Sequence, residues 1–244
     1  AAEAQRIVDA AFDAGVNFID TADAYSKGGS ERVVGAAIAK HRRRWILATK
    51  VANAVALGKP HDGGLSRRWM LQACDDSLAR LATDCIDIYY LHKDDPDTPL
   101  AETIGAMGDL IRSGKVRYFG VSNYRGWRIA EVVAECEAQG VAPPVVCQPY
   151  YNLLNRGPEV EILPACDYYG LGVAPYSPIA RGVLTGKYAS GAVPEGSRVA
   201  RKDGRILETE FRDESIAIAQ KLAGHAKKTG RTLTQFALAW LWAN

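Results

Sequence analysis

Short apolar runs alternate with amphipathic stretches along most of the chain. Most of the apolar runs lack strict alternation of apolar and polar residues, which indicates parallel strands covered on both faces. They are rich in Val, Ile, Tyr and Phe and cover residues 16–22, 45–51, 86–92, 116–123, 145–152 and 170–178. The pattern therefore predicts six buried strands in one parallel sheet.

Helical periodicity fills the stretches between these runs. Apolar residues recur at spacings of three, four and seven within residues 7–12, 71–81, 104–111 and 129–136, which places them on one face of a helix. The segment "TLTQ" (232–235) has the spacing of a capping box and predicts the start of another helix. Strands spaced about 25 to 40 residues apart, with helices between them, are typical of repeated βα units in a parallel sheet.

Two architectures fit repeated βα units: an open doubly wound sheet and a closed (β/α)₈ barrel. No predicted strand leads into G-x-G-x-x-G, the motif that an open dinucleotide-binding sheet usually carries. The sequence begins and ends on helix patterns, so one further strand at each end would complete eight. We therefore expect a single barrel domain over residues 1–244, with its first and last strands missing from this chain.

Composition excludes several classes of protein. Lys and Arg number 30 against 28 Asp and Glu, and this balance does not suggest a nucleic-acid or membrane-surface partner. We find no run of about 18 apolar residues, so we expect no membrane span. The five cysteines form no C-x-x-C pair. Their odd number argues against a disulfide scaffold or a zinc ribbon and favours a reducing, cytoplasmic compartment.

The predicted strands end on polar residues that could carry chemistry. Asp20, Lys50 and His92 end the first three runs, and Tyr25 follows Asp20 by five residues. Neighbouring strands lie about 4.8 Å apart, so these side chains can reach one point at the carboxyl edge of the sheet. Asp23 we expect to be a turn residue.

The four residues suit the protonation of a carbonyl oxygen while hydride arrives at its carbon. A tyrosine with a pKa of about 10 is a poor acid at neutral pH, but a nearby ammonium group favours its phenolate. Asp20 would hold Lys50 in place, and His92 could donate a hydrogen bond to the carbonyl oxygen. Taken singly, each residue also has an ordinary structural explanation, so the prediction depends on the combination.

The residues that other barrel enzymes would need are not found at the predicted strand ends. Paired carboxylates or a metal cluster at the strand ends would indicate a hydrolase or a lyase, and we find neither. His92 precedes Asp94 and Asp95 but has no second histidine nearby, so we expect no metal site.

Six segments together resemble the aldo-keto reductase family. They are "FIDTADAY", "LATK", "YYLH", "GVSNY", "QPYYNLLNR" and "PYSPIARGVLTGKY", and their order and spacing match over almost all of the chain. The resemblance implies a (β/α)₈ barrel that binds NADPH without a Rossmann fold. It also implies a catalytic tetrad, which falls here on Asp20, Tyr25, Lys50 and His92.

The resemblance implies cofactor-binding residues as well. Ser122, Asn123 and Gln148 would hold the nicotinamide carboxamide, and Tyr176 would stack on its ring. The implied contacts along the phosphates are Ser177, Pro178, Ile179, Arg181, Gly182, Lys187 and Arg198. The last two are similar to basic positions in the branch that contains the potassium-channel β subunits, which is nearest in loop style.

One alternative stays open for the cofactor and one for the function. The family's motif for the adenosine 2′-phosphate is absent from this sequence, so NADPH rather than NADH is implied by resemblance alone. A cofactor-binding regulatory subunit with little turnover is the alternative to an enzyme, although channel β subunits tend to carry Asn where this chain has His92. The substrate would be a small carbonyl compound, bordered by the loop at 51–64 and by residues such as Asn53, Trp127 and Tyr151.

Overall fold

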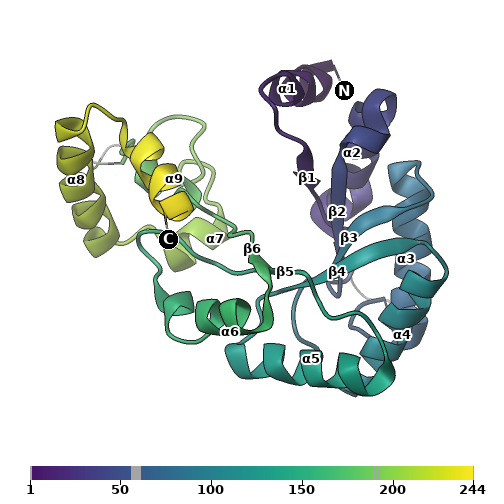
Figure 1. The fold of residues 1–244 in the computed structure, drawn as a ribbon. Coiled ribbons are helices and arrows are strands. Elements are labelled where there is room, and N and C mark those ends of the chain that lie inside the picture. The colour runs from purple at the N-terminus through teal and green to yellow at the C-terminus, as the bar shows by residue number, and fades with distance from the viewer. Residues whose placement is uncertain (1, 56–61, 189–190, 192, 244) are drawn as a thin grey trace. The chain divides into compact units, whose positions relative to one another are not determined.

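The computed structural model describes residues 2–55, 62–188, 191 and 193–243 (Figure 1). The chain forms two compact units. Unit 1 comprises Ala1–Gln148 with Pro164–Val173, and unit 2 comprises Pro149–Leu163 with Ala174–Asn244. Within the loop expected to border a substrate, residues 56–61 lie outside the described residues.

Unit 1 is built on a curled sheet of six parallel strands (Figure 1). The strands are β1 (Phe18–Asp20), β2 (Ile46–Val51), β3 (Ile86–Leu91), β4 (Val116–Ser122), β5 (Val146–Gln148) and β6 (Gly172–Val173). They follow one another in chain order, with no reversal of direction across the sheet. A doubly wound sheet reverses its strand order at a switch point, so that alternative is wrong for the described sheet. The parallel α/β prediction is confirmed.

The last two strands are shorter than the apolar runs that predict them. β5 ends at Gln148 because the next residue, Pro149, has no N–H to donate to a neighbouring strand. Beyond it, pairing is reduced to an isolated bridge between Tyr150 and Tyr176, next to Pro175. Apolar composition continues past these prolines, but a regular ladder of hydrogen bonds does not.

In unit 1, one helix precedes the first strand, and the others come between or after strands. The helices are α1 (Ala2–Asp13), α2 (Gly29–Ile38), α3 (Arg67–Leu81), α4 (Leu100–Arg112), α5 (Gly126–Gln139) and α6 (Ile162–Tyr169), within which the division between the units falls. Helices α2 to α5 pack against one another in chain order, and α3 to α5 lie along the outer side of the curled sheet (Figure 1). Gly140 ends α5 at a φ of +63°, a left-handed conformation that glycine adopts without steric cost.

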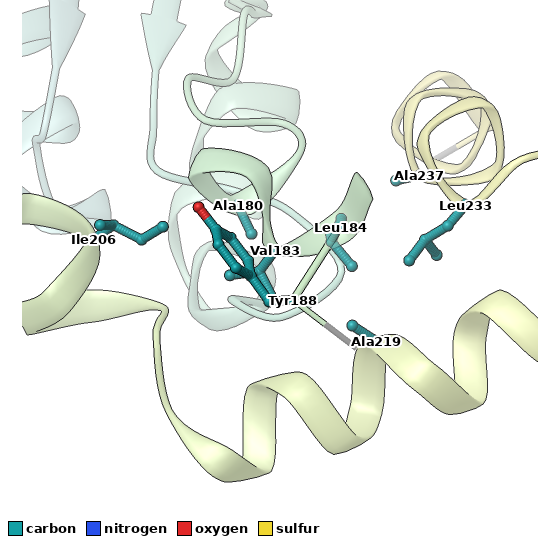
Figure 2. Close-up of a cluster of buried hydrophobic side chains, with 8 residues drawn as sticks. All are labelled: Ala180, Val183, Leu184, Tyr188, Ile206, Ala219, Leu233 and Ala237. Atoms are coloured by element: carbon teal, nitrogen blue, oxygen red, sulfur yellow. The ribbon is translucent and has the colours of Figure 1, made fainter. Parts of the chain in front are cut away.

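Unit 2 contains α7 (Gly204–Thr209), α8 (Asp213–Lys228) and α9 (Leu233–Ala243). The predicted capping box is confirmed: the Gln235 backbone N–H donates to Thr232 Oγ1 at 3.2 Å, and the Thr232 N–H donates to Gln235 Oε1 at 3.0 Å. A buried apolar cluster joins the three helices to the segment at 180–188 (Figure 2). Its members are Ala180, Val183, Leu184, Tyr188, Ile206, Ala219, Leu233 and Ala237. Within the described residues, no helix combines the length and the apolar character that a membrane span requires.

Candidate active site

A buried ion pair links the first two strands at their carboxyl ends. Lys50, near the end of β2, has a side chain that is 0% exposed, whereas that of Asp20, the last residue of β1, is 30% exposed. The Lys50 ammonium donates hydrogen bonds to the Asp20 carboxylate and, at 2.7 Å, to the Thr21 carbonyl oxygen. Burial lowers the pKa of Lys50, and the negative charges of Asp20 and Asp23 oppose that shift. The sequence correctly predicted that these two strand ends meet.

Tyr25 follows a turn in which its backbone N–H donates to the Ala22 carbonyl oxygen at 3.2 Å. Ser26 and Lys27, which follow it, adopt left-handed conformations with φ of 50° and 54°. L-residues rarely adopt this conformation, and the turn directs the chain sharply away after Tyr25. The Lys50 ammonium nitrogen lies 5.1 Å from the centre of the Tyr25 ring. The ammonium group of Lys50 and the aromatic ring of Tyr25 are therefore within the distance of a cation–π contact.

His92 follows β3 directly, and its ring contacts the Tyr25 ring. Its ring lies edge-on to the Tyr25 ring, with centroids 5.8 Å apart and an interplanar angle of 78°. Its backbone N–H donates to the Val51 carbonyl oxygen at 2.8 Å. Its Nδ1 lies 2.9 Å from the side-chain nitrogen of Asn53. All four predicted catalytic side chains thus lie in one connected group.

The ends of β4 and β5 extend the same group. Ser122 Oγ donates to the Gln148 carbonyl oxygen at 2.9 Å, and both side chains are buried. Asn123 takes a left-handed φ of 60° and donates from its amide to the His92 carbonyl oxygen at 2.9 Å. The Gln148 amide donates to Asp20 Oδ1 at 3.4 Å. The structure therefore brings the three residues expected at the carboxamide next to the four expected in catalysis.

Two buried carboxylates, Asp23 and Glu31, have no functional role predicted from the sequence. Asp23 belongs to a turn, as predicted, but it is 0% exposed, and its Oδ2 has no hydrogen-bond partner among the described residues. Burial raises the pKa of Asp23 to about 7. Glu31, on α2, is also 0% exposed and binds Arg80 at 2.5 Å and Thr49 Oγ1 at 2.6 Å. No sequence pattern marks these burials, because they depend on how α2 and α3 pack.

Unit 2 carries the other predicted cofactor residues. Tyr176 stacks on Tyr150, with ring centroids 5.4 Å apart and an angle of 23° between the planes. Ser177, with a left-handed φ of 54°, accepts a hydrogen bond at its carbonyl oxygen from the Asn152 amide at 3.0 Å. Pro178 is half-buried, and Ile179 packs against the apolar cluster of this unit. This segment is thus fixed by contacts within its own unit.

The basic residues of unit 2 have acidic or aromatic neighbours. Arg181 Nε lies 3.1 Å from the carboxylate of Glu210, a residue that is only 2% exposed. The Tyr150 hydroxyl donates to the same carboxylate. The Lys187 ammonium lies 5.3 Å from the centre of the Tyr188 ring. It also lies close to Gly182: a Cβ atom added to Gly182 would be only 2.9 Å from the Lys187 ammonium nitrogen. Arg198 forms an exposed ion pair with Asp203 at 3.4 Å.

Glu210 is a buried partner of the predicted cofactor residue Arg181 that the sequence did not reveal, because it lies in an unremarkable stretch before α8. Its buried carboxylate compensates the Arg181 charge and orders Tyr150 beneath Tyr176. Within the described residues, no group of three or more His, Cys, Asp or Glu side chains could hold a metal ion. All five cysteines are free thiols.

Comparison with known proteins identifies the family of this chain. The model of the aldo/keto reductase family matches residues 1–244. A probable voltage-gated potassium channel subunit beta of Oryza sativa subsp. japonica is 37% identical over 248 residues, covering 99% of this chain and 75% of the relative. An L-glyceraldehyde 3-phosphate reductase of Escherichia coli (strain K12) is 33% identical over 255 residues, covering 99% of this chain and 72% of the relative.

A third relative is the versiconal hemiacetal acetate reductase of Aspergillus parasiticus, 32% identical over 257 residues, which cover 98% of this chain and 74% of the relative. The full-length family match and the reductases among these relatives confirm the resemblance drawn from the sequence motifs. This chain belongs to the aldo/keto reductase family and is an oxidoreductase that acts on carbonyl groups.

Proposed function

We propose that the protein reduces aldehydes and ketones to alcohols with NADPH, using Tyr25 as the general acid. One observation carries the proposal. The fully buried Lys50 ammonium, paired with Asp20, lies 5.1 Å from the centre of the Tyr25 ring, and the His92 ring lies edge-on to the same ring at 5.8 Å. An acid, the charge that makes it acidic and a hydrogen-bond donor thus meet at the ends of three adjacent strands.

Tyr25 would give its phenolic proton to the carbonyl oxygen as that oxygen gains negative charge. The resulting phenolate is stabilised by the Lys50 ammonium, which the Asp20 carboxylate and the Thr21 carbonyl oxygen hold in place. Tyr25 is 43% exposed, so water can return the proton after each turnover. His92 would donate a hydrogen bond to the same carbonyl oxygen and orient it for protonation.

The strand ends of β4 and β5 fit the carboxamide of a nicotinamide. Asn123 and Gln148 carry amide groups that both donate and accept, and Ser122 carries a hydroxyl group beside them. Bound NADPH would supply the hydride that reaches the carbonyl carbon. In unit 2, Tyr176 offers an aromatic ring braced by Tyr150. Ser177, Pro178, Ile179 and Gly182 would line the phosphates, and Arg181, Lys187 and Arg198 would supply positive charge.

Membership of the family also supports proposals about the barrel architecture and the substrate. We propose that the six-stranded sheet is part of a closed (β/α)₈ barrel in which residues 1–244 form one domain. The free cysteines suit a reducing compartment such as the cytoplasm. The reductases among the relatives are named for different substrates, a triose phosphate and a hemiacetal acetate, at similar identity. We therefore propose only a small carbonyl compound as the substrate.

Replacement of Tyr25 by Phe tests the proposal. Turnover of an aldehyde and ketone panel, followed by NADPH oxidation, should fall by about 10²-fold to 10⁴-fold, the usual contribution of a general acid. NADPH binding, followed by cofactor fluorescence, should change little because the ring is kept. Tyr118→Phe is the matched control, since Tyr118 lies near the opposite end of its strand and is 55% exposed. Full activity of Tyr25→Phe would refute the proposal.

A cofactor-binding regulatory subunit is the second candidate. It is favoured by the probable potassium channel β subunits among the relatives, at 37% and 36% identity. The presence of His92 beside Tyr25 favours the enzyme, because a regulatory subunit does not need a donor at that point. Tight NADPH binding with no turnover of any member of the panel would favour the regulatory subunit.

A further inference from the structure

The contact between Asn53 and His92 has a chemical consequence for the site. The Asn53 side-chain nitrogen lies 2.9 Å from His92 Nδ1, between two partly buried groups. Asn53 follows β2 by two residues, whereas His92 follows β3 directly. The contact therefore spans two adjacent strand ends, close to the backbone bond between His92 and Val51.

The backbone before Asn53 is held in an unusual conformation. Ala52 has a φ of 128°, a value that residues other than glycine rarely adopt, and it is 2% exposed. Its carbonyl oxygen accepts a hydrogen bond from the Gly64 N–H at 2.8 Å. Such strain persists only where the surrounding structure enforces it, and it is frequent at functional sites. Here it fixes the direction in which the next side chain leaves the chain.

Other contacts restrain both the main chain and the ring of His92. Its backbone N–H and carbonyl oxygen are bonded to Val51 and to the Asn123 amide, at 2.8 and 2.9 Å. The Tyr25 ring packs against it edge to face. Because these contacts restrain the main chain and the ring plane, the Asn53 side chain contacts one specific nitrogen of the imidazole, Nδ1.

We propose that Asn53 is a positioning residue that fixes His92 as the neutral tautomer with its proton on Nε2. A carboxamide nitrogen can only donate hydrogen bonds, so the imidazole nitrogen facing it must present its lone pair. A neutral imidazole carries a single proton, which is therefore on Nε2. The role of this tautomer rests on the proposed function, because an Nε2–H is the group that can donate a hydrogen bond to a substrate carbonyl oxygen.

Substitution by Asp inverts this contact at almost unchanged size. A carboxylate accepts a hydrogen bond instead of donating one, so it selects a proton on Nδ1 and leaves the neutral ring without one on Nε2. Asn53→Ala removes the contact without selecting either tautomer. Asn17→Asp is the matched control, because Asn17 is exposed and precedes β1 at the other end of the sheet.

Long-range ¹H–¹⁵N correlation spectra of the full chain, labelled at histidine, give a readout that does not depend on activity. The chain has 4 histidines, and comparison with His92→Gln assigns the signals of His92. We expect an unprotonated Nδ1 and a protonated Nε2 in the parent protein and in Asn17→Asp. We expect a protonated Nδ1 in Asn53→Asp. A protonated Nδ1 in the parent protein, or a pattern unchanged in both Asn53 variants, would overturn the inference.

Kinetics separate this inference from the proposed function. In Asn53→Asp, kcat for carbonyl reduction should fall by about 100-fold, as for the loss of one oriented donor, while NADPH affinity stays within about threefold. Asn53→Ala should lose less. If the tautomer changes in Asn53→Asp and kcat does not fall, the role of Asn53 on the ring is supported and the role of His92 as the carbonyl donor is refuted.

Discussion

Asp20→Asn tests whether the buried ion pair works as the structure indicates. The substitution keeps the size of the side chain but removes the negative charge next to the Lys50 ammonium. Lys50 is 0% exposed and keeps the Thr21 carbonyl oxygen as an acceptor at 2.7 Å. A buried ammonium group with one neutral acceptor is poorly compensated, so the folded state should lose stability.

Two estimates of the magnitude agree. Removing one partner of a buried ion pair costs about 3–5 kcal/mol of unfolding free energy. The buried lysine can avoid a larger cost by losing its proton, and neutralising a group with an ordinary pKa of about 10.4 at pH 7 costs about 4.6 kcal/mol. Because the Asp20 side chain is 30% exposed, we expect the lower end, about 3 kcal/mol at pH 7.

The destabilisation should also depend on pH. Without Asp20, the pKa of Lys50 in the folded protein falls further below its value in the unfolded chain. The unfolded chain then binds more protons than the folded variant, so the stability of the variant rises with pH. Relative to the parent protein, the destabilisation should shrink by up to about 1.4 kcal/mol per pH unit between pH 7 and pH 9.

Urea unfolding of the full chain at pH 7, 8 and 9, followed by tryptophan fluorescence, measures this effect. Asp75→Asn is the matched control. Asp75 and Lys115 form an ion pair at 2.6 Å, but their side chains are 51% and 41% exposed. Their separation should therefore cost less than about 1 kcal/mol at every pH. A loss below about 1 kcal/mol for Asp20→Asn, or a loss that does not change with pH, would refute the reasoning.

Two further predictions concern the buried carboxylates of Asp23 and Glu210. Since burial raises the pKa of Asp23 to about 7, the folded protein holds a proton there that the unfolded chain releases near pH 4, and stability falls as pH rises between these values. Asp23→Asn should remove this dependence and stabilise the protein by up to roughly 4 kcal/mol above pH 7 in chemical denaturation; equal pH profiles would contradict it. Glu210→Gln should lower the melting temperature by leaving Arg181 uncompensated. NADPH should raise that temperature more in the variant than in the parent, because the cofactor phosphates would replace the lost charge; equal shifts would count against Arg181 as a phosphate ligand.

Local sequence patterns predicted the repeated elements well. Apolar runs without alternation predicted parallel strands, and the capping box at Thr232 and Gln235 forms as its spacing indicates. In a parallel sheet the strand ends share one edge, so the pattern of apolar runs was enough to group Asp20, Lys50 and His92. These features depend on backbone geometry and on residues close in sequence, which local sequence patterns describe.

Packing between distant segments decided the rest. Glu31, on α2, is buried against Arg80 of α3 and Thr49 of β2, and the pair of Arg181 and Glu210 joins residues 29 positions apart. The contact of Asn53 with His92 follows directly after Ala52, whose φ of 128° no local preference predicts. The sequence by itself therefore determined which groups stand at the strand ends. Beyond the expected pair of Asp20 and Lys50, only the tertiary structure decided which groups are buried and which further partners they contact, because those properties come from contacts between residues far apart in the sequence.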